Sequence, residues 1–148
     1  MKMIGLSVML MLLAGCGQQQ TGTMIDPQDA AKVARGQAVY AASCAACHGA
    51  RLEGQPDWRR RKPDGRMPAP PHDDSGHTWH HPDEILFGIT REGLVPGKYG
   101  PPGYVSDMPA FGGVLGDADI AAVLSYIQSR WSPEVRRARE EMLRNRGR

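Results

Sequence analysis

The sequence is short of aromatic residues and of cysteines, and it contains no apolar run long enough to cross a membrane. Aromatic side chains make up only 6% of the 148 residues, so a core built from side chains alone would be thin. A buried cofactor would supply the missing apolar bulk. The three cysteines are at positions 16, 44 and 47, and an odd number leaves one sulfur over from a framework of disulfides. The cysteines therefore have other tasks.

The sequence also has little net charge, and it has no stretch with the pattern of a β-strand. The formal net charge is only +2, which gives no strong field to attract nucleic acid or an anionic membrane surface. No stretch alternates apolar and polar residues as a strand does, and neither an internal repeat nor a βαβ unit is visible. The chain is long enough for one domain with a modest core. We therefore expect a single all-α domain that binds no nucleic acid.

The first residues have the pattern of a secretory signal. Lys2 precedes about twelve mostly apolar residues that end at Ala14, too few to span a bilayer. The tetrapeptide LAGC, which ends at Cys16, resembles the lipobox of bacterial lipoproteins. The resemblance implies cleavage before Cys16 and attachment of acyl chains to its sulfur and its new amino terminus, which together make a stable membrane anchor. The alternative is an ordinary signal peptide with a cysteine at this position by chance.

The lipobox defines the expected organisation of the N-terminal region. Residues 1–15 are expected to be a signal peptide that is removed. Residues 16–26 are expected to be a lipidated flexible tether, because 17–25 are small and polar without periodicity. The protein would then be exported and anchored on the periplasmic side of a membrane. Gly17 stands where inner-membrane lipoproteins carry an aspartate, which favours the outer membrane in a Gram-negative cell.

Helical periodicity and helix-boundary signals predict three main helices and a short arginine-rich one. In the first, Gly36 lowers helix stability, so we expect it to lie where another helix approaches closely. The third has an apolar face with a 3.6 period, made of Ile120, Val123, Leu124, Ile127 and Trp131. The helices are expected from Asp26-Pro27 to about Ser43, from His81-Pro82 to near Gly93, from Asp117 to Trp131, and after Ser132-Pro133.

Two long irregular segments separate these helices. Residues 49–81 contain five prolines and no sustained helical period, and loops of this length usually wrap a ligand or carry function. In residues 93–113, ten of 21 positions are Gly or Pro, which limits the flexibility of that loop. The first loop is therefore a candidate to enclose a bound group.

The pentapeptide CAACH, residues 44–48, has the pattern of a covalent haem attachment site. Its two thiols lie one helical turn apart and can reach the two vinyl groups of a haem, while His48 places an imidazole under the iron. A thioredoxin-like redox pair would need a βαβ context, which is missing. A structural zinc site would need four ligands, and Cys16 is not free once it carries lipid. We therefore predict one haem c bound covalently through Cys44 and Cys47, with His48 as an axial ligand.

From about residue 27 to residue 131 the chain resembles the class I cytochrome c family. Gly36 and Tyr40 precede CAACH at the spacing of the family's N-terminal glycine and aromatic residue. The segment DMPAFGG, residues 107–113, is similar to its axial-methionine loop, and VLSYI, residues 123–127, is similar to its C-terminal helix. The resemblance implies an all-α cytochrome c fold, in which a small helical domain wraps around one haem and transfers single electrons.

The iron of such a haem has a second face, and the resemblance implies that Met108 occupies it. Met108 is sixty residues beyond His48, on the stiff loop before the last core helix, and Pro109 biases its backbone toward an extended form. The rival is Met67, which also precedes a proline but is only 19 residues from His48. A third alternative leaves the sixth position open or fills it with histidine. On the other face, the resemblance implies that a carbonyl within Pro68–Pro71 accepts the free imidazole N–H.

The cluster HTWHH allows both a functional and a plain structural interpretation. His77, His80 and His81 have i, i+3, i+4 spacing, which would suit a copper or zinc ion. Pro82 argues against a shared face, because it starts a helix directly after His81. In that case the three imidazoles are helix-cap or solvated groups, and Trp79 shields a haem propionate.

Two basic stretches depart from the family's pattern or lie outside it. The loop WRRRKPDGR, residues 58–66, is longer and more basic than in the related proteins. Residues 132–148 are expected to form a basic C-terminal helix or tail. Each stretch is either a solvated face or a surface that docks an acidic redox partner and raises the association rate.

These features predict an electron carrier, not an enzyme. The partners would be redox proteins, a donor and a terminal oxidase or reductase, reached from a membrane anchor. Two other function classes stay open: a haem-based enzyme or gas sensor with an open sixth position, and a copper-handling lipoprotein that uses the histidine cluster.

Overall fold

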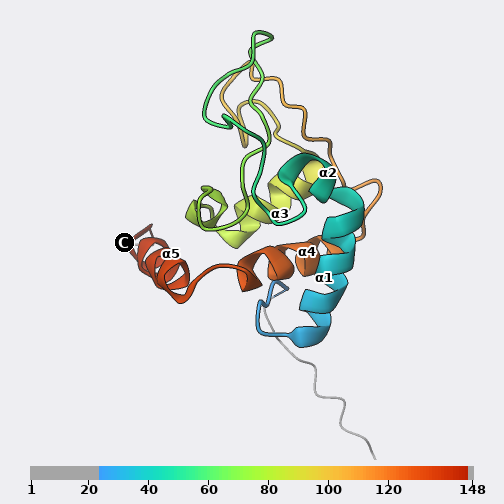
Figure 1. Ribbon diagram of the computed structural model, residues 1–148, viewed down its shortest axis with the longest axis vertical. Helices are drawn as coiled ribbons and strands as arrows, with labels where there is room; N and C mark the ends of the chain where they lie inside the picture. Colours follow the sequence, from blue (N-terminus) through green and yellow to red (C-terminus); the bar gives the residue numbers. More distant parts are fainter. Residues whose placement is uncertain (1–23, 147–148) are drawn as a thin grey trace, which may run out of the picture.

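The computed structural model describes residues 24–146 and consists of helices and long loops (Figure 1). Within that range no strand forms, and an isolated β-bridge joins Pro96 and Gly100. The all-α prediction is therefore confirmed. The elements in chain order are α1 (Ala30–Ser43), α2 (Ala45–His48), the 3₁₀ helix η1 (Thr78–His80), α3 (Asp83–Glu92), α4 (Asp117–Ser129) and α5 (Pro133–Arg146).

Helix α1 ends at Ser43 as predicted but begins later than expected. The carboxylate of Asp29 accepts the backbone N–H groups of Ala31 and Lys32, so Asp29 is the N-cap residue. Asp26, where the helix was expected to begin, instead accepts the N–H of Gln28 in a separate turn. Two aspartates three residues apart can both cap a helix, and the second one does so here.

Helices α1 and α4 cross at Gly36, as the sequence predicted. A Cβ atom on Gly36 would lie 1.9 Å from the backbone oxygen of Ala122, so only glycine permits this approach. Close to the crossing, the rings of Tyr40 and Tyr126 pack with their centroids 5.5 Å apart. The crossing joins the N-terminal and C-terminal parts of the domain.

Replacing Gly36 by alanine is expected to destabilise the protein by about 1–3 kcal/mol, because the added methyl group overpacks the crossing against backbone that cannot yield. The free energy of unfolding in urea measures this loss. Gly113→Ala is the matched control, since a Cβ there would meet nothing within 4 Å. Equal stability of the two variants would contradict the assigned crossing.

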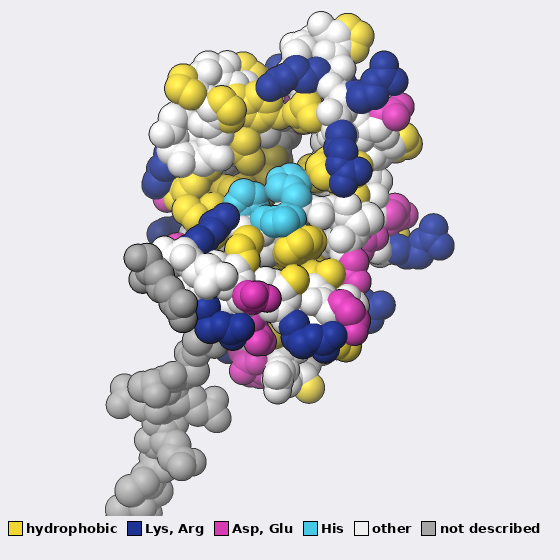
Figure 2. Space-filling view, turned by 90° about the vertical axis from the view of Figure 1, so that its left-hand side faces the viewer, with side chains coloured by type: hydrophobic (Ala, Val, Ile, Leu, Met, Phe, Trp, Pro, Cys, Tyr) yellow, Lys and Arg dark blue, Asp and Glu magenta, His cyan; other side chains and the backbone are white. Residues whose placement is uncertain are grey.

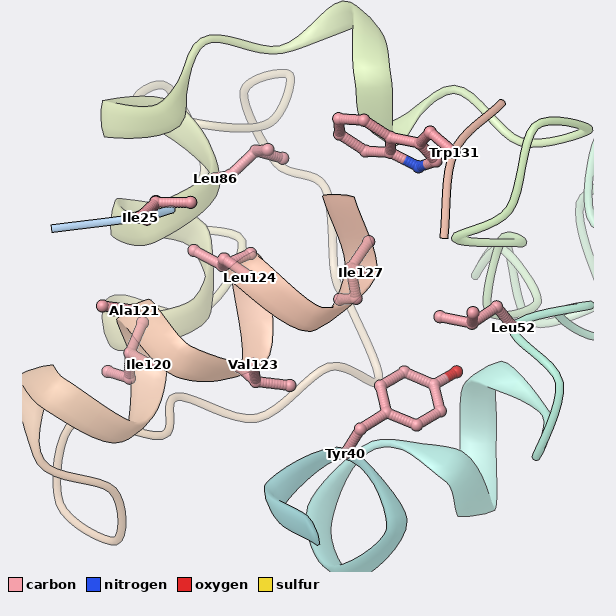
Figure 3. Packing of buried hydrophobic residues seen from close by; sticks show 10 residues of the cluster. All are labelled: Ile25, Tyr40, Leu52, Leu86, Ile120, Ala121, Val123, Leu124, Ile127 and Trp131. Atoms are coloured by element: carbon pink, nitrogen blue, oxygen red, sulfur yellow. The ribbon is translucent and has the colours of Figure 1, made fainter. Parts of the chain in front are cut away.

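The buried core lies between α4 and the surrounding elements (Figure 3). Every residue of the apolar face predicted for the third helix is buried, with 4% or less of its surface exposed. The helix itself, α4, ends at Ser129, two residues before the predicted end, so Trp131 lies just beyond it. Other buried side chains come from α1, α3, the loop after α2 and the segment before α1. The full cluster is Ile25, Tyr40, Leu52, Leu86, Ile120, Ala121, Val123, Leu124, Ile127 and Trp131.

Two residues assigned from sequence to the tether belong to the folded domain. Ile25 is 6% exposed and packs in the core. The backbone N–H of Asp26 donates to the hydroxyl of Ser125 on α4. The predicted tether, residues 16–26, therefore extends too far along the chain. The burial of the Ile25 side chain and the hydrogen bond of Asp26 attach its last residues to the folded domain. Residues 1–23, including Cys16, lie outside the described part of the chain.

The two predicted loops are present and lie side by side above the helices in Figure 1. Residues 49–77 form one loop, and residues 93–116 form the other. Ion pairs tie them together: Asp107 accepts from Lys62 at 2.9 Å and also from Arg66. Both basic residues are in the first loop and Asp107 is in the second. The ion pairs therefore hold the two loops together as one lobe.

Helix α5 is longer and more closely packed than the short arginine-rich helix that was predicted. Arg139 is 6% exposed, and its guanidinium donates to the carbonyls of Trp79, at 2.9 Å, and His81. It also forms an ion pair with Asp83 at 2.6 Å. Arg139 therefore fastens α5 to the junction between η1 and α3, and it is not part of a solvated basic face.

Candidate functional site

The CAACH segment is folded into a single turn at the end of α1. The backbone N–H of Cys44 donates to Tyr40, and the carbonyl of Cys44 accepts from Cys47 at 3.1 Å and from His48 at 3.0 Å. This places the two cysteines at i and i+3 on one face of the turn, as thioether attachment to one haem requires. Cys44, Cys47 and His48 are thus brought together.

Tyr40 connects this turn to the helical core. Its ring is buried against Tyr126 on α4, and its hydroxyl donates to the carbonyl of Gly49 at 2.8 Å and lies 3.3 Å from that of His48. The α1–α4 crossing therefore positions the end of the motif as well as its beginning.

The imidazole of His48 is prepared to bind a metal through its second nitrogen. The residue is 8% exposed, and its Nδ1 lies 2.8 Å from the carbonyl of Pro70. Since a carbonyl only accepts, Nδ1 carries the proton and Nε2 keeps its lone pair. Pro70 lies within the predicted segment Pro68–Pro71. Burial lowers the pKa of His48, although the hydrogen bond to Pro70 opposes the shift. The ring is therefore neutral at neutral pH, the form that ligates iron.

The two thiols do not have the properties of a redox-active pair. No disulfide joins them, and Cys44 is half-buried while Cys47 is exposed. Burial, and then the neighbouring Cys47, raises the pKa of Cys44 to about 11. Redox-active dithiols have thiols with lowered pKa values, so the thioredoxin-like alternative is disfavoured.

A hollow beside the histidines suits an apolar group with acidic substituents. Figure 2 shows it lined largely by hydrophobic side chains, with histidine side chains along its edge. Within residues 24–146, one buried side-chain nitrogen has no hydrogen-bond partner, Nε1 of Trp79. Such a donor costs about 1–3 kcal/mol when unsatisfied, and a haem propionate has the chemistry to accept from it. The apolar lining of the hollow and the CAACH turn fit the predicted haem, and the buried indole N–H fits its acidic substituents.

The two candidate methionine ligands lie in different loops. Met108 is half-buried in the loop of residues 93–116, where its N–H donates to the hydroxyl of Ser106 at 3.0 Å. The preceding residue is Asp107, which carries the ion pairs to the other loop. Met67 is also half-buried, so burial does not distinguish the two.

The histidine cluster does not assemble a second metal site in the described part of the chain. No group of three or more His, Cys, Asp or Glu side chains between residues 24 and 146 is arranged to hold a metal ion. The ring of His80 stacks on Trp79 at 3.6 Å, and that of His77 stacks on Trp58 at 5.5 Å. As the sequence suggested, Pro82 separates η1 from α3 directly after His81.

Sequence reasoning missed His72 as part of the site. Its ring stacks on His48, with centroids 4.0 Å apart and planes 22° from parallel. Burial, followed by the proximity of His48, lowers the pKa of His72 well below its ordinary value, so this ring is also neutral. The one sequence signal was its position two residues after Pro70, directly after the segment Pro68–Pro71 that was expected to support His48.

Between residues 24 and 146, no helix combines the length and apolar character needed to cross a membrane.

Comparison with known proteins gives one family and one relative. The model of the cytochrome c family matches residues 33–131. The gluconate 2-dehydrogenase cytochrome c subunit of Pantoea cypripedii is 31% identical over 99 residues, which is 65% of this chain and 20% of the relative. The chain thus spans about one fifth of the relative's length. No solved structure matches.

The relative corrects the prediction that the chain is not an enzyme. Its name places a cytochrome c chain inside a dehydrogenase, as one of the subunits. A cytochrome c sequence therefore does not by itself exclude membership of an enzyme, and the prediction was wrong to treat electron transfer and enzyme as exclusive classes.

The family match covers about two thirds of the chain and includes every residue of the folded CAACH turn. It also includes Gly36, all of α4 and all of α1 except its first three residues. The chain therefore belongs to the cytochrome c family and carries a covalently attached haem c.

Proposed function

We propose that this cytochrome c transfers single electrons through a haem with His48 and Met108 as axial ligands, from a lipid anchor at Cys16. The observation that carries the proposal is the state of His48. Its imidazole is buried, directly follows the two cysteines, and donates from Nδ1 to Pro70. That arrangement presents the basic Nε2 to iron in a fixed orientation. The haem, when bound, supplies the one-electron chemistry.

The location of Met67 favours Met108 as the second ligand. Met67 is three residues before Pro70, whose carbonyl contacts the nitrogen of His48 that faces away from iron. We infer that Met67 belongs to the segment that supports the His48 side. Met108 lies in the other loop. Because the ion pair of Arg66 with Asp107 joins the residues directly before Met67 and Met108, it is the distance along the chain from Pro70 that distinguishes the two methionines. A thioether ligand favours reduced iron and raises the reduction potential.

The loop of residues 58–66 is the proposed docking surface for an acidic redox partner. Two of its charges are neutralised within the molecule, because Lys62 and Arg66 pair with Asp107. Arg59 lies over the ring of Trp58 at 4.2 Å, and Arg60 is exposed on the same loop. Exposed arginines of this kind steer a partner of opposite charge and act mainly on the association rate.

The partners and the cellular location follow from the same proposal. By similarity to a dehydrogenase subunit, a dehydrogenase is the proposed electron donor, and a terminal oxidase or reductase is the proposed acceptor. The lipobox at Cys16 supports export and anchoring on the periplasmic side, at the outer membrane in a Gram-negative cell. No observation favours the copper-handling alternative.

The absorption spectrum of the purified protein tests the axial ligands. The ferric form is expected to be low-spin with a sulfur-to-iron charge-transfer band at the red end of the visible range. The reduced form should bind carbon monoxide slowly or not at all near neutral pH, because the sixth position is filled. Rapid binding of carbon monoxide, without the band, would favour a haem enzyme or gas sensor instead.

A further inference from the structure

The axial imidazole of His48 is held at one edge and on one face. At the edge, Nδ1 donates to the carbonyl of Pro70 at 2.8 Å. On the face, the ring of His72 lies 4.0 Å away and only 22° from parallel. The second torsion of a histidine side chain is broad and only roughly two-fold, so a single hydrogen bond leaves the ring free to rock. A flat ring stacked against it removes much of that freedom.

His72 is itself held by contacts from three parts of the chain. Its Nδ1 lies 2.8 Å from the hydroxyl of Thr78, a buried residue of η1. The indole N–H of Trp131, just after α4, donates to the carbonyl of His72 at 2.9 Å. The N–H of His72 donates to the carbonyl of Leu52 at 2.8 Å. Contacts that do not involve His48 therefore fix both the backbone and the ring of His72.

We propose that His72 is a positioning residue that sets the plane of the His48 imidazole above the haem. The inference rests on the proposed role of His48 as an axial ligand and adds the group that orients it. The plane of an axial imidazole determines how its π orbitals overlap with those of the iron, and thus how unpaired spin is distributed over the porphyrin. Ligand orientation by a neighbouring side chain is a general feature of metal sites.

Proton NMR of the ferric, haem-loaded protein tests this role, because the order of the haem methyl resonances reports the orientation of the axial imidazole. His72→Leu is expected to change that order or to broaden the resonances, since leucine fills space but presents no flat face. His72→Phe restores a flat ring without the nitrogen atoms and should recover an order close to that of the unmodified protein. A purely volume-filling role of His72 would not separate these two variants.

Two further variants keep the test decisive if His72→Leu does not retain haem. Thr78→Val removes the partner of the His72 ring and should shift the resonances in the direction of the leucine variant, by a smaller amount. His80→Leu is the matched control, because its ring stacks on Trp79 and not on His48, and it should leave the order unchanged. An unchanged order and linewidth of the haem methyl resonances in His72→Leu would overturn the inference. If His72→Leu does not retain haem, an unchanged order and linewidth in Thr78→Val would overturn it.

Failure of this inference and failure of the proposed function are distinguishable. If the unmodified ferric protein is high-spin, its sixth position is open and the proposed function fails. If the low-spin spectrum persists in His48→Ala, His48 is not the ligand and the proposed function fails as well. If the unmodified protein is low-spin through His48 but the His72 variants match it, only the positioning role is wrong.

Discussion

Replacing Met108 by alanine is expected to abolish the sulfur-to-iron charge-transfer band and to expose the ferrous iron to carbon monoxide. Alanine has no donor atom, so the sixth position becomes available to small ligands. The reduction potential should fall, because the thioether that favours the ferrous state is gone. Ferric absorption spectra, the rate of carbon monoxide binding and a redox titration measure the three effects on one preparation.

Met67→Ala is the matched control for this experiment. Both methionines are half-buried and both precede a proline, so the two substitutions remove similar apolar volume. The band and the slow reaction with carbon monoxide should persist in Met67→Ala. The assignment would be reversed if the band survived in Met108→Ala and disappeared in Met67→Ala.

The features predicted correctly from sequence are those that neighbouring residues determine. The CAACH turn needs only its own five residues, and the apolar face of α4 follows from a 3.6 period within one helix. Gly36 was assigned to a helix crossing because a glycine inside a helix needs a packing reason. The irregular loops followed from their proline and glycine content.

The features that sequence did not predict depend on contacts between distant residues. Arg139 contacts backbone and side chains about sixty positions earlier, so its run of neighbouring arginines resembled a solvated face. His72 stacks on a ring 24 positions away, and its position directly after Pro71 did not by itself separate it from the other histidines. Ile25 and its neighbour Met24 are the apolar residues of a polar segment, and only the core that receives Ile25 accounts for the burial of one and the exposure of the other.

The role of the domain in a larger assembly also lies outside what sequence motifs determine. The residues that hold and orient a haem are similar whether electrons pass between separate proteins or within an enzyme. The relative with a dehydrogenase name therefore overturned the enzyme prediction, although the haem prediction was right. Surface residues, such as the arginines of 58–66, are where such assemblies would differ.

Replacing Cys16 by serine is expected to move the protein from the membrane fraction to the soluble fraction of the periplasm. The variant should still carry haem and keep its reduction potential, since the CAACH turn and both proposed ligands are unchanged. Its turnover with a membrane-bound partner should fall by about tenfold or more, because an anchored domain encounters the partner at a high effective concentration and a soluble one does not.

Cell fractionation and electron-transfer rates at equal amounts of haem in whole cells measure these two effects. Thr21→Ser is the matched control, a conservative change close to Cys16 that leaves the lipobox intact and should stay with the membrane. Retention of Cys16→Ser in the membrane fraction would show that the cysteine is not the anchor. If the variant is released but its turnover is unchanged, the lipid determines where the protein resides and contributes nothing to the rate. A slower soluble variant would mean that confinement to a surface is itself part of how this cytochrome c reaches its partner.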